Sequence, residues 1–136
     1  MRALDHIGIA VRSIEERLAV YRALGLAPAG GEEVASQKVR VAFVPLGDTR
    51  LELLEPTADD SPIAGFIAKR GEGIHHLCIE VDDVRAAMAG LRSAGLQLLS
   101  EEPQPGAHGA QVCFVHPRSA GGVLIELSQP GPGRHE

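Results

Sequence analysis

The feature that most constrains the fold of this chain of 136 residues is an internal repeat. At an offset of 70 positions, His6 matches His76 and Gly25 matches Gly95. At an offset of 74 positions, Glu52 matches Glu126. A repeat of this length predicts two copies of one supersecondary unit, with four additional residues in the loops of the second copy, around 106–109 or 118–122.

Alternating apolar residues predict the strands of each copy, and capping residues predict the helices. Strands are expected at residues 6–11, 38–46, 50–55, 76–81, 96–100, 110–115 and 122–128. Helices are expected at 14–24, 62–70 and 84–94, after the caps Ser13, Ser61 and Asp83. Residues 28–33 are predicted to form a loop, and residues 130–136 a frayed tail.

The order of these elements predicts an α+β fold. Two pseudo-symmetric βαβββ modules, about residues 4–56 and 74–130, are expected to be joined by the short helix 62–70. The modules would form a curved mixed sheet around a metal site, with helices on the outer face, within a single domain of residues 1–136.

Composition and charge exclude several classes of function. A net charge of −5 without a Lys/Arg cluster argues against a nucleic-acid partner. The sequence contains neither an apolar run of the ~20 residues that span a bilayer nor a recognisable signal peptide, so no membrane partner is expected. Cys78 and Cys113 lie in apolar runs without close-spaced partners, which is typical of buried thiols in a reducing compartment. A cytoplasmic location is therefore predicted.

Two histidines and two glutamates are the candidate site residues. Glu52 and Glu126 each lie between apolar neighbours that should pack against a helix, so both carboxylates face the other side of the sheet with His6 and His76. A single His or Glu in a strand is usually an ordinary residue, but four at matched repeat positions favour a shared role. Because burial of an unpaired carboxylate costs several kcal/mol, this set predicts a divalent metal site with mixed N/O ligands.

Four segments carry a resemblance to a known family: DHIGIAV (5–11), GDTRLELLEP (47–56), SPIAGFIAKRGEGIHHLCIEVDD (61–83) and GAHGAQVCFVHPRSAGGVLIEL (106–127). The chain resembles the methylmalonyl-CoA epimerases of the vicinal oxygen chelate superfamily over residues 4–129. The resemblance implies that His6, His76 and Glu126 are metal ligands and that Glu52 takes the fourth position. It also implies one divalent ion, with Co²⁺ favoured and Zn²⁺, Mn²⁺, Ni²⁺ or Mg²⁺ accepted, and a homodimer.

The implied reaction is metal-dependent epimerisation of (R)- and (S)-methylmalonyl-CoA, by abstraction and return of the 2-proton through a metal-stabilised enolate. Glu126 is the expected catalytic base. Residues 37–43 contain no acidic residue, so a water, another residue or a single base serving both faces must act opposite Glu126. Contacts with the acyl-CoA substrate are expected from Lys69, His108, Gly109 and Arg118.

Two alternative functions use the same scaffold. A lyase of the glyoxalase I type would share the four ligands, but its aromatic-rich stretches are missing here. A non-catalytic ligand-sequestering protein of the bleomycin-resistance type usually lacks the four ligands and uses an aromatic-lined groove. An aromatic content of 3% fits that alternative poorly. An extradiol dioxygenase would need a longer chain and an iron triad of different makeup.

Overall fold

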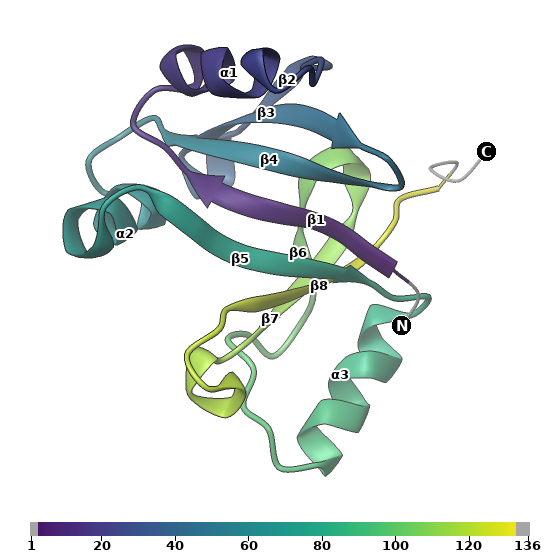
Figure 1. The fold of residues 1–136 in the computed structure, drawn as a ribbon. Coiled ribbons are helices and arrows are strands. Elements are labelled where there is room, and N and C mark those ends of the chain that lie inside the picture. Colours follow the sequence, from purple (N-terminus) through teal and green to yellow (C-terminus); the bar gives the residue numbers. More distant parts are fainter. Residues whose placement is uncertain (1–2, 133–136) are drawn as a thin grey trace. The chain divides into compact units, whose positions relative to one another are not determined.

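The computed structural model describes residues 3–132 of the chain (Figure 1). These residues form two compact units, one of residues 6–75 and one of residues 76–132 together with residues 3–5. Two strands cross the boundary between the units: β1 (Ala3–Ala10) and β5 (Gly73–Glu80). Each unit has its own group of four paired strands within the eight-stranded sheet and its own apolar core, so the two are described separately.

The unit of residues 6–75 contains a mixed four-stranded sheet within the described part of the chain. After β1 come α1 (Ile14–Ala23), β2 (Gly31–Val34), a 3-10 turn η1 (Ala35–Gln37), β3 (Val39–Leu46), β4 (Thr49–Pro56) and α2 (Pro62–Arg70). The strand order is β2-β3-β4-β1. β4 pairs with β1 in parallel, whereas the other neighbouring pairs are antiparallel.

The other unit repeats this topology among its described residues. After β5 come α3 (Val84–Ser93), β6 (Gln104–Pro105), η2 (Ala107–Gly109), β7 (Gln111–Val115), η3 (Pro117–Ala120) and β8 (Ile125–Gln129). The strand order is β5-β8-β7-β6, again with one parallel pair, between β8 and β5. The α+β fold with two βαβββ modules is therefore confirmed.

The strand registers confirm the repeat residue by residue. Gly8 lies opposite Glu52 in the β1–β4 pair, and Cys78 lies opposite Glu126 in the β5–β8 pair, which reproduces the offsets of 70 and 74. Phe43 pairs with Glu52 and Phe114 with Glu126, nine and twelve residues earlier in the chain. Three of the four additional residues therefore lie between β7 and β8, in the connection that contains η3.

In each unit one helix covers one face of the four strands, as the apolar neighbours of Glu52 and Glu126 predicted. α1 packs its buried Ile14 against Val44 and Leu53 of the first sheet, and α3 packs its buried Met88 against Cys113 and Leu127 of the second. Burial of a large aliphatic side chain stabilises a fold by about 1.5–3 kcal/mol, so these two clusters account for much of the stability of each unit. Within residues 3–132, no helix is long and apolar enough to cross a membrane.

The helix starts are capped as predicted, and the structure adds a second cap to two of them. Ser13 accepts a hydrogen bond from the Glu16 N–H at 3.2 Å, Ser61 accepts one from Ile63 at 3.1 Å, and Asp83 accepts one from Ala86 at 3.1 Å. In addition, Glu55 accepts from the Ile14 N–H at 2.8 Å and Gln129 accepts from the Val84 N–H at 2.9 Å. These last two acceptors also match at the offset of 74, so the repeat extends to the second cap.

Two secondary-structure predictions were wrong. The predicted loop 28–33 contains the start of β2, an edge strand whose Glu32 and Glu33 concealed the pattern but whose backbone pairs with β3. The predicted strand 96–100 is absent from the described chain, where only Leu98 forms an isolated bridge, with Val115. The Arg92 guanidinium donates hydrogen bonds to the carbonyls of Ser100 and Glu101, so a side chain and not a neighbouring strand supplies these donors.

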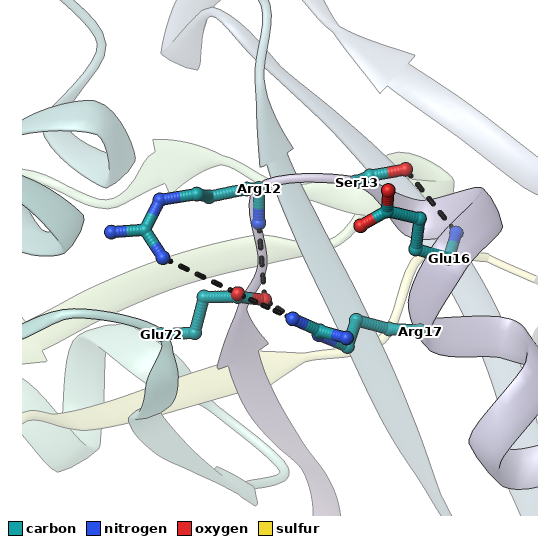
Figure 2. Close-up of polar contacts among 5 residues, drawn as sticks. All are labelled: Arg12, Ser13, Glu16, Arg17 and Glu72. Carbon is teal, nitrogen blue, oxygen red and sulfur yellow. Dashed lines mark hydrogen bonds and ion pairs between the residues drawn. The ribbon is translucent and has the colours of Figure 1, made fainter.

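A three-residue ion cluster holds the segment that leads into β5 (Figure 2). The Glu72 carboxylate accepts hydrogen bonds from Arg17 Nε at 2.9 Å and Arg17 Nη2 at 2.8 Å, and it also contacts the Arg12 backbone N–H and guanidinium at 3.3 and 3.4 Å. The hydrogen bond from Arg17 is the main cause that lowers the pKa of Glu72 from 4.5 to about 2. Glu72 is flanked by Gly71 and Gly73, and the positive φ of 78° at Gly71 ends α2.

Candidate functional site

In the unit of residues 6–75, the structure brings His6 and Glu52 together on the sheet face opposite α1. Their side chains are 7% and 5% exposed, and His6 Nδ1 lies 3.3 Å from Glu52 Oε2. This face is set by the parallel β1–β4 register, because His6 lies two residues before Gly8, the residue opposite Glu52. Two of the four predicted ligands therefore form a buried imidazole–carboxylate pair within one unit.

Arg50 contacts the same glutamate. Its Nε and Nη2 lie 2.7 and 2.6 Å from Glu52 Oε2, and its guanidinium carbon lies 5.6 Å from the centre of the Phe43 ring. Since Phe43 is the cross-strand partner of Glu52, the arginine is held between an aromatic face and a carboxylate of neighbouring strands.

In the unit of residues 76–132, His76 and Glu126 form the matching pair. His76 Nε2 lies 3.0 Å from Glu126 Oε1, and the side chains are 8% and 10% exposed. Phe114, the cross-strand partner of Glu126, meets the His76 ring edge-on, with 6.1 Å between ring centres. The second pair thus has the same residue types as the first, and in both a phenylalanine lies opposite the glutamate on the neighbouring strand.

Each pair offers the donor set that divalent transition metals prefer. An imidazole nitrogen and a carboxylate oxygen at 3.0–3.3 Å are close enough to contact one ion together, and both pairs are buried. A buried carboxylate needs a compensating positive charge or donated hydrogen bonds, and a cation supplies the former. The residues present therefore fit a divalent metal.

The predicted substrate contacts lie on the surface of their units. Lys69 is exposed in the last turn of α2, and Arg118 is exposed in η3, where its backbone N–H donates to His116 Nδ1 at 3.0 Å. His108 and Gly109 are exposed in η2, with positive φ angles of 57° and 73°. A left-handed non-glycine residue is uncommon and marks a loop whose shape is imposed by its surroundings.

The two cysteines and His75 are not among the predicted site residues. Cys78 and Cys113 are both buried and are not disulfide-bonded, as predicted, and burial raises the pKa of the Cys113 thiol. His75 is half-buried and stacks edge-on against Phe66 of α2, with 4.9 Å between ring centres. His135 lies outside the described residues.

Sequence reasoning missed Arg50 and the two phenylalanines. A readable signal existed for Arg50, because Arg50-Leu51-Glu52 places an arginine and a glutamate two residues apart in a strand, hence on one face. For Phe43 and Phe114, proximity to the pairs depends on antiparallel register, which a single strand does not reveal.

Comparison with known proteins defines the class of this chain. Residues 5–114 match the model of the Glyoxalase/Bleomycin resistance protein/Dioxygenase superfamily. The chain belongs to this superfamily.

Within it, several relatives are named methylmalonyl-CoA epimerases. The human mitochondrial methylmalonyl-CoA epimerase is 46% identical over 93% of this chain and 73% of its own length. An ethylmalonyl-CoA/methylmalonyl-CoA epimerase of Cereibacter sphaeroides is 44% identical over 93% of this chain and 96% of its own. A Streptomyces coelicolor methylmalonyl-CoA epimerase variant, solved in complex with 2-nitronate-propionyl-CoA, has 36% identity and a TM-score of 0.90 over 97% of this chain and 96% of its own. These homologues are isomerases, which confirms the family identified from the sequence.

Proposed function

We propose that this protein is a methylmalonyl-CoA epimerase. The observation that carries the proposal is the duplicated, buried His–Glu pair in a chain 44–46% identical to proteins named methylmalonyl-CoA epimerases. A lyase of the glyoxalase I type or a ligand-sequestering protein would belong to the same superfamily, but the human and Cereibacter sphaeroides relatives are named epimerases.

His6, Glu52, His76 and Glu126 are proposed to hold one divalent ion, with Co²⁺ the favoured metal. The matched registers and equal burial of the two pairs support a shared ligand role. When bound, the ion would supply Lewis-acid charge beside the substrate oxygens.

The reaction requires removal of the proton on carbon 2, which lies between the thioester and the carboxylate of the acyl group. Glu126 is proposed to take this proton; the electron pair of the C–H bond moves toward the thioester oxygen, and a proton returns to the opposite face of carbon 2. The first unit presents Val41 and Phe43 beside its pair, both apolar, so β3 supplies no carboxylate to that role. A water, another residue or Glu126 itself must return the proton.

The exposed loop residues His108 and Gly109, together with Arg118 and Lys69, are proposed to contact the acyl-CoA. Glycine at 109 allows close approach of the backbone, and the two cations suit the phosphates of the CoA moiety. A homodimer in the cytoplasm remains part of the proposal, and light scattering of the purified protein tests its oligomeric state.

Incubation with methylmalonyl-CoA in D₂O tests the function directly. We expect one deuterium at carbon 2 and interconversion of the two epimers, followed by mass spectrometry and NMR. In a parallel incubation with the methylglyoxal–glutathione hemithioacetal, consumption of this substrate would identify a lyase if methylmalonyl-CoA takes up no deuterium. Metal analysis of the same sample separates both enzymes from a sequestering protein, which should contain no stoichiometric divalent ion.

A further inference from the structure

The pair of His6 and Glu52 includes a third charged side chain, Arg50, on Glu52. Arg50 Nε donates a hydrogen bond to Glu52 Oε2 at 2.7 Å, and Arg50 Nη2 forms an ion pair with the same oxygen at 2.6 Å. The Arg50 side chain is only 18% exposed. The Arg50 guanidinium is therefore largely shielded from water, and its charge acts more strongly there than on an open surface.

The repeat provides an internal reference for this arginine. At the offset of 74 that relates Glu52 to Glu126, the position matching Arg50 is Leu124, which carries no charge. The pairs have the same ligand types and the same phenylalanine neighbour, so the arginine is a specific departure from the repeat and not a requirement of the βαβββ module.

We propose that Arg50 is a specificity-determining residue whose positive charge beside Glu52 favours an acyl-CoA with a carboxylate on its acyl group. This inference rests on the proposed function. Arg50 places one positive charge beside Glu52, within a pair that is proposed to hold the metal. Methylmalonyl-CoA brings an acyl carboxylate to this site, whereas propionyl-CoA, the same thioester without that carboxylate, does not.

The same geometry has a consequence for metal affinity. A guanidinium fixed on a metal ligand repels the cation, so Arg50 weakens ion binding while it favours the anionic substrate. Glu52 keeps its place without Arg50 because its backbone is paired on both sides, to β1 and β3, and its side chain also lies against His6. Removal of the arginine should therefore affect charge more than ligand position.

The test compares Arg50→Leu, which copies the matched Leu124, with Arg50→Lys and with the wild type. We expect Arg50→Leu to bind Co²⁺ about tenfold more tightly and to raise KM for methylmalonyl-CoA about tenfold or more, as loss of one nearby charge implies. The inhibition constant of propionyl-CoA should not change. Arg50→Lys keeps the charge and should restore most of the KM. Arg40→Leu is the matched control, since Arg40 pairs with Glu55 at 3.4 Å and its side chain is 56% exposed; it should leave KM and Co²⁺ binding unchanged.

Parallel loss of methylmalonyl-CoA and propionyl-CoA binding in Arg50→Leu would overturn the inference, because Arg50 would then only shape the site. Weaker Co²⁺ binding in that variant would also overturn it, by showing that Arg50 chiefly orients Glu52. If the wild type incorporates no deuterium, the proposed function fails, whereas the Co²⁺ titration, which needs no substrate, still decides whether Arg50 opposes cation binding.

Discussion

Glu126 and Glu102 belong to one unit but have opposite surroundings. The Glu126 side chain is 10% exposed beside His76, whereas Glu102 is 66% exposed and pairs with Arg85 at 2.6 Å. We expect Glu126→Gln to slow deuterium incorporation at carbon 2 by at least about 100-fold, the usual contribution of a positioned base. Glu102→Gln serves as the control and should keep the wild-type rate. A Glu126→Gln protein that is folded by circular dichroism yet exchanges normally would contradict the proposed role.

The lowered pKa of Glu72 predicts that the free energy of unfolding depends on pH. Its pKa is about 2 in the folded protein and near 4.5 when unfolded, so its contribution is fully present above about pH 4.5 and is lost as the pH falls toward 2. We expect Glu72→Gln to lower the free energy of unfolding by about 1 kcal/mol at pH 7, as is usual for a partly exposed ion pair. Urea titrations of both proteins should give curves that converge between pH 4.5 and pH 2. A difference that grows with acidity would contradict the assignment.

At the scale of elements, two glycines should respond oppositely to alanine. Gly90 lies inside α3, and a Cβ there would meet nothing within 4 Å, so Gly90→Ala should stabilise the protein by about 0.5–1 kcal/mol. A Cβ at Gly131 would lie 2.8 Å from the Gly109 carbonyl oxygen and 2.9 Å from that of His108. Gly131→Ala should therefore destabilise the protein by about 1–3 kcal/mol, the range for overpacking. Thermal unfolding measures both, and equal shifts in one direction would contradict this packing.

The same contact shows how an element acquires its shape. The segment after β8 passes over the carbonyls of η2, where His108 has a φ of 57°. Neither sequence segment predicts this crossing, because it joins backbone groups more than 20 residues apart in the chain.

At the scale of the whole molecule, metal removal should lower stability if the four-ligand proposal is correct. A ligand that binds only the folded state stabilises it by about 2.7 kcal/mol at a concentration 100 times its Kd. We therefore expect treatment with a chelator to lower Tm and Co²⁺ to restore it. His76→Ala should show a smaller response, and His108→Ala, which leaves the four proposed ligands intact, should respond like the wild type. An unchanged Tm in the wild type at saturating Co²⁺ would contradict the proposed metal site.

Much of each unit could be predicted because its signals are local. Ser13, Ser61 and Asp83 cap the helices that they were expected to cap, since a cap acts within three residues of itself. The predictions of a loop at 28–33 and a strand at 96–100 were wrong because the structure of these segments is not set locally. Whether residues 31–34 pair with β3, and whether Arg92 binds the carbonyls at 100 and 101, depends on groups outside the segment itself.

The sequence by itself determined the repeat, the family and the four candidate ligands, because side-chain alternation and matched spacing are written along the chain. The tertiary structure alone decided which groups meet within each unit: His6 with Glu52, His76 with Glu126, and Arg50 on only one of the two glutamates. These contacts could not be predicted from the sequence because strand register and the packing of buried charges determine them. Both arise only when separate strands pair.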